Sequence, residues 1–363
     1  AILTRHRPGP DDVTQLIYTS GTTGEPKGVM HSANTLMSNI VRYAERMQLS
    51  HDDVVLMASP LAHQTGFIYG LMMPIVLQAS TVLPDIWAPR KAVELIRAER
   101  VSFTMASTPF LTDLAHAVAE SGDPVPTLRA FLCAGAPIPG PLVEQAQKAL
   151  GAKVISAWGM TENGGVTTTL LEDADERAIN TDGLPLPGIE VRVRDADGTV
   201  LAAGAIGRLQ VRGCSNFGGY LKRPQLNDTD TEGWFETGDL ARIDEAGYLR
   251  ITGRSKDVII RGGENIPVVE VEALLYRHPA VAQAAIVAYP DERLGERACA
   301  VVVAKPGQSI DMASMVGFLK SQKLTLQYLP ERLIVLEAMP VTPSGKIQKF
   351  KLREMVREAA PGA

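Results

Sequence analysis

The run YTSGTTGEPKG, from Tyr18 to Gly28, is the most informative part of this chain. Between Thr19 and Gly28 it places three glycines and four hydroxyl side chains within ten residues. Glycine lets the backbone approach a ligand closely, and hydroxyl and backbone N–H groups bind phosphate oxygens, so the run predicts a polyphosphate-binding loop. It is not a Walker A motif, because Lys27 precedes Gly28 instead of following it. A flexible surface loop is the alternative.

A second loop near the other end of the chain carries a single lysine. The run MPVTPSGK, from Met339 to Lys346, contains two prolines and a glycine, which shape a turn with Lys346 at its tip. A solvated surface charge is the usual role of such a lysine. The two loops together predict a nucleotide enzyme in which a separate lobe supplies a mobile cation.

Residues 13–159 alternate short β-rich runs with longer amphipathic ones. Strands are expected at 16–19, 54–58, 102–106, 130–133 and 153–157, and helices at 32–47, 89–100, 109–120 and 139–150. Three of these four helices open on proline, which suits the first helical turn, where the missing N–H would have no partner. The alternation predicts an α/β fold with mixed sheets flanked by helices.

The pattern changes near Gly183. Short strands at 190–194, 208–212 and 248–252 predict a small β subdomain. After Gly253 an α+β unit is expected, with helices at 268–276, 312–320 and 348–358 and strands at 284–288, 298–303 and 332–336. We therefore expect residues 1–182 and 183–255 to be two parts of a large domain, and residues 256–363 to be a small C-terminal domain carrying Lys346.

The composition excludes several classes of protein. The 363 residues are 45% hydrophobic and 21% charged, which is ordinary for a globular protein of two or three units. The net charge of −5 offers no basic surface for nucleic acid. The most apolar run, Phe67 to Leu83, contains proline and polar residues and is too short to span a membrane, so a buried helix followed by a strand is expected.

The three cysteines, Cys133, Cys214 and Cys299, lie far apart in no metal-binding spacing. They predict reduced thiols, packed as small core residues, in a cytoplasmic protein. The chain opens at Ala1 without an initiator methionine and shows no signal peptide, so a targeting segment upstream stays open.

Further motifs accompany the two loops: WGMTE at 158–162, TGDL at 237–240, and Arg254. With them the chain resembles the acyl-adenylate-forming (AMP-binding) superfamily, whose members include acyl-CoA synthetases, adenylation domains of peptide synthetases, and luciferases. The resemblance runs from Val13 to the C-terminal helix, with the motifs in the family's order. It implies a large N-terminal domain and a mobile C-terminal domain joined by a hinge, and it implies ATP, Mg²⁺ and CoA as cofactors.

The resemblance assigns the phosphate and metal contacts first. Thr161 would donate to the α-phosphate, and Glu162 would bind Mg²⁺ on the ATP phosphates, since a hard cation prefers carboxylate oxygen. A helix N-cap followed by an acidic first-turn residue is the alternative for this pair. The loop residues implied to bind nucleotide are Thr19, Ser20, Gly21, Thr22, Thr23, Gly24 and Lys27.

The nucleoside contacts follow in the same way. Trp158 would stack on adenine, with Gly135, Ala136 and Pro137 on the other side of the base, although a core aromatic is the ordinary role of a tryptophan. Asp239 would accept hydrogen bonds from both ribose hydroxyls, with support from Arg254. The alternative for Asp239 is a solvated turn residue. Asn265 is also assigned to the nucleotide.

Two assignments concern the movement of the small domain. Lys256 matches the family's hinge position, where a few backbone torsions let that domain turn, and a surface lysine is the alternative. Gly262 and Gly263 resemble the loop that lines the pantetheine tunnel of CoA, where glycine leaves room for a narrow thiol arm.

The acyl pocket is implied by His63, in PLAHQTG at 60–66, together with Gly135, Gly159 and Gly164. A core histidine is the alternative for His63. The absence of an acid around His63 favours an uncharged acyl tail over an amino acid. Gly159, Gly164 and Gly165 leave room for a bulky or cyclic acyl group of medium length.

The resemblance implies a two-step ligase with Lys346 as the catalytic residue. The carboxylate would displace pyrophosphate from ATP to give acyl-AMP, and rotation about Lys256 would then withdraw Lys346 and admit the CoA thiol. Since almost nothing precedes the phosphate loop, the chain resembles an N-terminally truncated member. An acyl-CoA synthetase is expected. The two alternatives are a module that loads a carrier protein and a non-catalytic fragment that only binds. A homodimer is left open.

Overall fold

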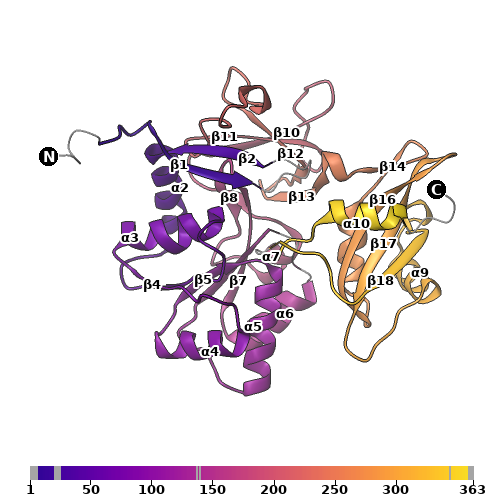
Figure 1. Cartoon of the computed structure of the whole chain (residues 1–363), viewed down its shortest axis with the longest axis horizontal. Coiled ribbons are helices and arrows are strands. Elements are labelled where there is room, and N and C mark those ends of the chain that lie inside the picture. Colours follow the sequence, from indigo (N-terminus) through magenta and orange to yellow (C-terminus); the bar gives the residue numbers. More distant parts are fainter. Residues whose placement is uncertain (1–6, 20–25, 136–137, 139, 343–344, 359–363) are drawn as a thin grey trace. The chain divides into compact units, whose positions relative to one another are not determined.

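The computed structural model describes residues 7–19, 26–135, 138, 140–342 and 345–358 (Figure 1). The chain divides into two compact units. Unit 1 comprises residues 1–237 and 242–250, and unit 2 comprises residues 238–241 and 251–363. The chain therefore crosses between units inside two strands, β12 (Phe235–Ile243) and β13 (Leu249–Arg254). The expected subdivision at residues 182 and 255 stays a prediction.

Unit 1 is built around a seven-stranded mixed sheet in the order β4-β3-β5-β6-β7-β8-β9. The strands from β4 to β7 pair in parallel, whereas β8 and β9 run antiparallel. This confirms the predicted α/β class. The strands are β3 (Val54–Leu56), β4 (Ser80–Val82), β5 (Phe103–Ala106), β6 (Ala130–Ala134), β7 (Lys153–Met160), β8 (Gly164–Thr168) and β9 (Leu184–Pro185).

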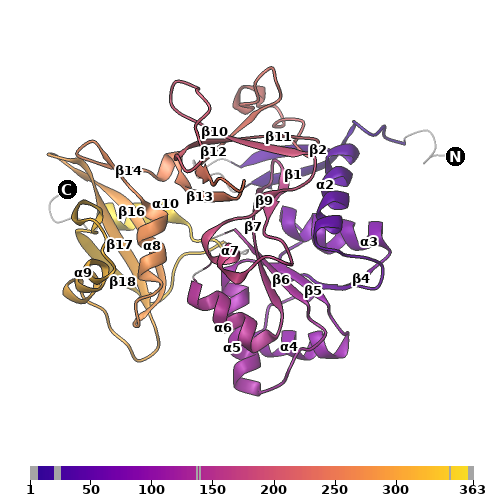
Figure 2. The ribbon, with the colours of Figure 1, turned by 180° about the vertical axis from the view of Figure 1, so that it is seen from behind.

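Helices cover both faces of this sheet, because the side chains of one strand alternate between two cores. Phe131 and Cys133 of β6 belong to the core beneath α4 (Pro89–Ala98), α5 (Thr108–Ser121) and α6 (Gly140–Leu150). Ala130 and Leu132 belong to the core beneath α2 (Ala33–Arg46) and α3 (Met73–Leu77). Figures 1 and 2 show α4, α5 and α6 grouped together, away from α2 and α3. The short α7 (Asp175–Asn180) follows β8.

The helix starts follow the predicted chemistry. Pro89 and Pro109 lie in the first turns of α4 and α5. Ser32 caps α2 and forms a capping box with Thr35. Pro139, expected to open α6, is outside the described residues.

The apolar run at 67–83 forms a π-helix, η1 (Gly66–Met72), followed by α3 and β4. The helix-then-strand order is confirmed, but the segment is only partly buried, since Ile75 is 63% exposed. Among the residues that the structure describes, every helix is too short or too polar to cross a lipid bilayer.

A separate hairpin precedes the large sheet. Strand β1 (Val13–Thr19) pairs antiparallel with β2 (Lys27–Ser32), and Thr19 lies opposite Lys27. The other edge of β2 bonds to residues 218–221, through Met30 N–H to the Gly219 carbonyl and Leu221 N–H to the Gly28 carbonyl. A small core of Ile17, Val29, Phe217, Tyr220 and Phe235 fills the space between these segments.

The expected β subdomain is present as a four-stranded sheet in the order β10-β11-β12-β13, with β10 (Ile189–Arg194) and β11 (Gly207–Gly213) antiparallel. A 3₁₀ turn, η2 (Pro224–Leu226), precedes β12. The guanidinium groups of Arg192 and Arg212 lie 4.1 and 4.6 Å from the Trp234 ring centroid. These cation–π contacts hold the buried Trp234 against the sheet.

Unit 2 has a sheet in the order β15-β14-β17-β16, with β18 parallel to β17. Its two faces are covered by different helices. Ala284 and Ile286 of β16 face the core with α8 and α9, whereas Ala285 and Val287 face the core with α10. In agreement, α10 lies in front of the sheet in Figure 1 and α8 in front of it in Figure 2. The elements are η3 (Ser255–Asp257), β14 (Ile259–Arg261), β15 (Glu264–Ile266), α8 (Val268–Leu275), β16 (Val281–Asp291), β17 (Gly295–Ala304), α9 (Met312–Ser321), η4 (Leu326–Tyr328), β18 (Arg332–Leu336) and α10 (Lys349–Glu358).

The three cysteines are free thiols. Cys133 and Cys299 are buried core residues, and burial raises the pKa of each to about 12. Cys214 is exposed, so the expectation that all three are core residues is wrong at that position. Cys214 lies one residue beyond β11, in a turn, where the chain leaves the sheet.

Candidate functional site

Thr161 and Glu162 lie in the tight turn between β7 and β8. Two other segments hold the backbone of this turn: His31 Nε2 donates to the Thr161 carbonyl at 2.8 Å, and Phe217 N–H donates to the Glu162 carbonyl at 2.8 Å. The helix N-cap alternative is wrong, because a strand follows the turn. The turn is therefore fixed from β2 and from the 217–221 segment at once.

The Glu162 carboxylate is buried, with 6% of the residue exposed. The Tyr220 hydroxyl donates to Glu162 Oε1 at 2.7 Å. Burial and the nearby Glu162 charge raise the pKa of Tyr220, so its hydroxyl keeps its proton and remains a donor. The Lys27 ammonium lies 4.8 Å from the centroid of the Tyr220 ring, within the range of a cation–π contact. Lys27, Tyr220 and Glu162 thus form one contact chain.

His31 is 1% exposed, and each of its two ring nitrogens has an oxygen partner. Its Nε2 must carry a proton, because a carbonyl can only accept, while Nδ1 lies 3.0 Å from the Thr35 hydroxyl. Burial lowers the pKa of His31, although the bond to the Thr161 carbonyl opposes this shift. A neutral imidazole protonated at Nε2 donates to the Thr161 carbonyl and can accept from the Thr35 hydroxyl at Nδ1.

The glycines of β8 have a packing role. Tyr69 O–H donates to Asn39 Oδ1 at 2.6 Å and accepts from Gly165 N–H at 2.7 Å, and Asn39 Nδ2 donates to the Gly165 carbonyl at 2.8 Å. A Cβ at Gly164 would lie 2.7 Å from Asn39 Oδ1, and one at Gly165 would lie 2.8 Å from the Tyr69 hydroxyl oxygen. Asn39 and Tyr69 thus fill the positions that a Cβ would take at these two glycines.

Several predicted residues follow the carboxyl ends of neighbouring parallel strands. Gly135 directly follows β6, and Trp158 is near the end of β7, where Ala134 pairs with Ala157. Ligands of open α/β sheets bind at this edge. Trp158 is half-buried and packs against the α2 side of the core, so it is not a fully buried core aromatic. The structure thus brings Gly135 and Trp158 to one edge.

His63 lies in the segment that follows β3, whose carboxyl end is at the same edge. It is exposed, and Thr65 N–H donates to its Nδ1 at 3.3 Å. The core-histidine alternative is therefore wrong. Gly159 is exposed, but a Cβ there would collide with the Gly164 carbonyl across the β7–β8 pair. Membership of an acyl pocket stays a prediction for His63, Gly135, Gly159 and Gly164.

The predicted phosphate loop is described only at its two ends. Thr19 and Lys27 close the β1–β2 hairpin as partners. Ser20, Gly21, Thr22, Thr23 and Gly24 lie outside the described residues, as do Ala136 and Pro137. Their assignment to the nucleotide stays a prediction.

Asp239 and Arg254 belong to unit 2. Asp239 is in β12 and 2% exposed, and its Oδ1 lies 2.9 Å from Arg254 Nε. The solvated-turn alternative is wrong, because this carboxylate is buried and paired. An ion pair of this kind gives the carboxylate a fixed orientation.

Lys346 lies on a short hairpin of unit 2. Val341 and Ile347 form an antiparallel bridge, Gln348 N–H donates to the Pro340 carbonyl at 2.8 Å, and Thr342 N–H donates to the Lys346 carbonyl at 2.9 Å. Gly345 has φ +79°, which glycine adopts without strain. Lys346 itself is exposed. Its backbone is thus positioned by bonds within residues 340–348.

The hinge and CoA residues are also exposed. Lys256 is in η3 and next to Asp257, which pairs with Arg353 at 2.8 Å. Gly262 and Gly263 connect β14 and β15 with φ of +60° and +91°, as a type I′ hairpin turn requires. The turn explains both glycines without a tunnel, and their role toward CoA stays a prediction. Asn265 is exposed in β15.

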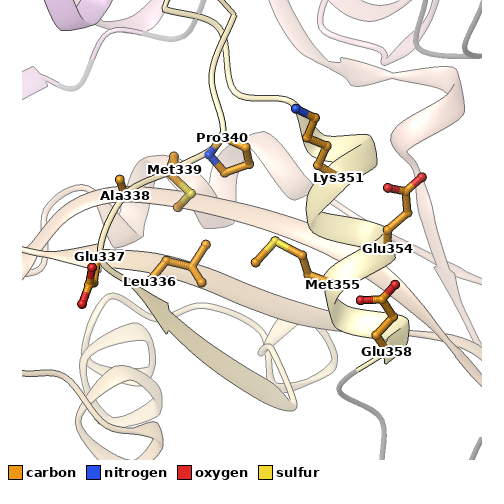
Figure 3. Close-up of a pocket in the computed structure, with 9 residues that line it drawn as sticks. All are labelled: Leu336, Glu337, Ala338, Met339, Pro340, Lys351, Glu354, Met355 and Glu358. Atoms are coloured by element: carbon orange, nitrogen blue, oxygen red, sulfur yellow. The ribbon is translucent and has the colours of Figure 1, made fainter.

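Unit 2 also has an open groove of about 720 Å³ between residues 336–340 and α10 (Figure 3). Leu336, Met339 and Met355 converge on it, with Glu354 and Glu358 along its rim. None of the predicted site residues lines this groove. Across the described residues no cluster of three or more His, Cys, Asp or Glu side chains is arranged to hold a metal.

Sequence reasoning missed four residues of the site: His31, Asn39, Tyr69 and Tyr220. Their partners are distant in sequence, 130 residues away for His31 and 58 for Tyr220. The sequence held one signal for His31, because His31 follows the predicted phosphate loop by a few residues. His31 and Lys27 lie on the same strand, β2.

Comparison with known proteins identifies the family. A family model described as "AMP-binding enzyme" matches residues 3–221, and one described as "AMP-binding enzyme C-terminal domain" matches residues 270–346. The chain is 40% identical over 347 residues to the medium-chain fatty-acid–CoA ligase of Escherichia coli (strain K12), covering 95% of this chain and 61% of the relative. It is 35% identical over 365 residues to a salicylyl-CoA synthase / salicylate adenylyltransferase of Streptomyces sp, covering 99% and 66%.

Among solved structures, ATP-bound MatB from Rhodopseudomonas palustris superimposes with a TM-score of 0.90 at 31% identity. The match covers 97% of this chain and 69% of that one. The chain spans about three fifths of the length of the first of these curated relatives.

Proposed function

Because the chain belongs to the family of AMP-binding enzymes, we propose that it is an ATP-dependent acid–thiol ligase. In the first half-reaction a carboxylate oxygen attacks the α-phosphorus of ATP, the bond to the β-phosphate oxygen breaks, and acyl-AMP and pyrophosphate form. In the second, the thiol of CoA attacks the acyl carbon, AMP leaves, and the thiol proton passes to solvent. This is the reaction class of an AMP-forming carboxylate–CoA ligase.

The observation that carries the proposal is the buried, oriented carboxylate of Glu162. Its Oε1 accepts from Tyr220, and Glu162 lies in a turn held from β2 and from Phe217. A single carboxylate fits Mg²⁺, which keeps several waters and is bound through one or two carboxylates together with substrate phosphates. When bound, Mg²⁺ would neutralise phosphate charge. Glu162 is thus proposed to hold it, and Thr161 to donate to the α-phosphate.

The adenosine moiety is proposed to be bound by Trp158, the 135–137 segment and Asp239. Asp239 suits a ribose because a carboxylate has two acceptor oxygens for two hydroxyls, and its bond to Arg254 at 2.9 Å fixes its plane. Asn265 is proposed as a further nucleotide contact.

Lys346 is proposed as the catalytic residue of adenylation. A carboxylate and a triphosphate repel each other, so an ammonium group that contacts the carboxylate and α-phosphate oxygens lowers the barrier by charge neutralisation and alignment. For thioester formation the same ammonium would obstruct the thiol. We propose that the small domain turns about Lys256, withdrawing Lys346 and bringing Gly262 and Gly263 to the pantetheine arm.

The acid is proposed to be a medium-chain fatty or cyclic carboxylic acid, with His63 beside its acyl group. Two relatives support this substrate class by name, one a medium-chain fatty-acid–CoA ligase and the other a salicylyl-CoA synthase. The absence of an acidic residue near His63 agrees with an uncharged tail. A homodimer also stays a proposal.

The test is a pyrophosphate-exchange screen of the chain against fatty acids of C4 to C12 and against benzoate-type acids. Exchange with at least one acid, followed by AMP release that requires CoA, would support the ligase. Acyl transfer to a carrier-protein thiol but not to CoA would assign the carrier-loading reaction instead. Binding of a non-hydrolysable acyl-adenylate analogue without exchange would identify a chain that binds and does not catalyse, and would refute the ligase proposal.

A further inference from the structure

Tyr220 makes the one side-chain hydrogen bond to Glu162 found in the described part of the chain. Tyr220 is 4% exposed and Glu162 6% exposed, so water is nearly excluded from the pair. The donor–acceptor distance of 2.7 Å is typical of a phenol bonded to a carboxylate. Tyr220 thereby occupies one oxygen of Glu162, Oε1, and no other side chain of the described residues bonds to Oε2.

The Tyr220 ring is itself fixed on several sides. Val29 of β2 forms a β-bridge with Tyr220, and Phe217 packs its edge against the ring at 4.8 Å between centroids. Lys27 lies over the ring. Since Lys27 starts β2 directly after the predicted phosphate loop, Tyr220 connects that loop to Glu162 through two contacts of its own side chain.

We propose that Tyr220 is a positioning residue, whose hydroxyl orients Glu162 so that Oε2 binds the cation of a cation–ATP complex. The proposal rests on the proposed function in one respect, the assignment of the cation to Glu162. A carboxylate that rotates freely must be ordered when it binds a cation, and this ordering weakens the binding. The Tyr220 hydrogen bond orders the Glu162 carboxylate before the cation binds, so the cation does not have to order it.

The chain contains a matched control. Tyr248 O–H donates to Asp173 Oδ1 at 2.7 Å, and the Arg177 guanidinium lies 4.1 Å from the Tyr248 ring centroid. Tyr248 is 7% exposed and belongs to the same unit as Tyr220. Both tyrosines therefore combine a phenol–carboxylate bond with a cation over the ring, but Asp173 is outside the predicted site. A Tyr→Phe change removes the same chemical group at each position.

The experiment measures ATP binding by isothermal titration calorimetry with Mg²⁺ and, separately, with EDTA. For Tyr220→Phe we expect the Mg²⁺-dependent gain in ATP affinity to fall by about tenfold, in line with the loss of a hydrogen bond to a charged group. ATP affinity in EDTA should stay within about twofold of the wild-type value, because no contact to the nucleotide is removed. Tyr248→Phe should keep the full Mg²⁺-dependent gain.

Glu162→Gln completes a double-mutant cycle. Glutamine keeps an acceptor for the Tyr220 hydroxyl but removes the charge, so it should abolish the Mg²⁺-dependent gain, and adding Tyr220→Phe should change nothing further. Three results would overturn the proposal: a full Mg²⁺ gain in Tyr220→Phe, an equal loss in Tyr248→Phe, or a wild-type ATP affinity that does not respond to Mg²⁺. A wild type that binds Mg²⁺–ATP but exchanges no pyrophosphate would refute the ligase and leave the Tyr220 result valid.

Discussion

The two loops that carry the proposed chemistry are held in opposite ways. The Thr161–Glu162 turn of unit 1 is bonded to segments 130 and 58 residues away, through His31 and Tyr220. The Lys346 hairpin of unit 2 is closed by backbone bonds within residues 340–348. Moving Glu162 would break bonds to two other segments, whereas the backbone bonds named for the hairpin all join residues of the hairpin itself. The difference agrees with the roles proposed above, a fixed metal-binding carboxylate for Glu162 and a lysine that acts in adenylation alone for Lys346.

The largest effect is expected from Lys346→Ala. Loss of the ammonium should lower pyrophosphate exchange by about 10²- to 10³-fold, the cost of removing one preorganised charge-stabilising group. Thioester formation from a supplied acyl-adenylate should be unchanged, and so should the free energy of unfolding, because Lys346 is exposed. Both half-reactions can be measured separately by exchange of labelled pyrophosphate and by release of AMP.

Lys351→Ala is the control, since it removes another exposed ammonium, from α10 of the same unit. It should leave both half-reactions at the wild-type rate. An equal loss of the two half-reactions in Lys346→Ala would contradict the idea that this lysine acts in adenylation alone.

Tyr69→Phe tests the anchoring in unit 1 of β8, the strand that follows the Glu162 turn. It leaves the buried Gly165 N–H without its acceptor and Asn39 Oδ1 without its donor. The free energy of unfolding should fall by about 1–3 kcal/mol, the cost of a buried unsatisfied polar group. Urea denaturation followed by circular dichroism measures this, with the exposed Tyr18→Phe as control. A change below that seen for Tyr18→Phe would mean that the Tyr69 bonds do not stabilise β8.

A smaller effect is expected from the acid titration of His31. Burial holds the pKa of His31 below its usual 6.5 in the folded chain, so the unfolded chain takes up the proton first as the pH falls. The contribution of neutral His31 to stability is therefore present above pH 6.5 and is lost as the pH falls toward the folded-state pKa, at a slope of at most about 1.4 kcal/mol per pH unit.

His31→Gln removes this titration and keeps an N–H that can donate to the Thr161 carbonyl. Its free energy of unfolding should therefore fall less between pH 7.5 and 5 than that of the wild type, as measured by urea titrations at each pH. His51→Gln, at a histidine whose side chain is 72% exposed, should follow the wild-type curve. Parallel curves for wild type and His31→Gln would show that His31 does not titrate between folded and unfolded states.

The smallest effect concerns the rate at which the cysteine thiols are labelled. This rate compares the two units without a substitution in either site. Cys214 should react at once with a thiol reagent, while Cys133 of unit 1 and Cys299 of unit 2, each with a pKa of about 12, should react only on opening. In a Cys214→Ser background we expect Cys299 to be labelled first, because the smaller unit buries less surface. Peptide mapping by mass spectrometry gives the order. Earlier labelling of Cys133 would mean that unit 1 opens more readily than unit 2.

The sequence predicts well those elements whose signal is local. The parallel strands β5, β6 and β7 are short apolar runs between proline-started helices, and each lies close to its expected position. Strands β2, β8 and β15 were missed, because Lys27, Gly164 and Glu264 give them no apolar run. Pairing with a neighbouring strand makes these segments β-structure, and that neighbour cannot be read from local pattern.

The site divides in the same way. Glu162 and Asp239 are found because each lies in a motif of consecutive residues. Tyr220 and His31 are found only when the chain is folded, since neither has a motif of its own and each acts on a partner in another segment. The resemblance implied the support of Asp239 by Arg254, but the local pattern did not predict the burial of Asp239, because its Gly238 neighbour is typical of turns.

The distribution of indole rings gives this molecule a built-in optical label. Its three tryptophans, Trp87, Trp158 and Trp234, all belong to unit 1, so intrinsic tryptophan emission comes from that unit alone. Far-ultraviolet circular dichroism records the secondary structure of both units. If the midpoints of the two signals coincide in a denaturation experiment, the units unfold together. If they differ, the part of the circular dichroism change that tryptophan emission does not follow reports the unfolding of unit 2, without any attached dye.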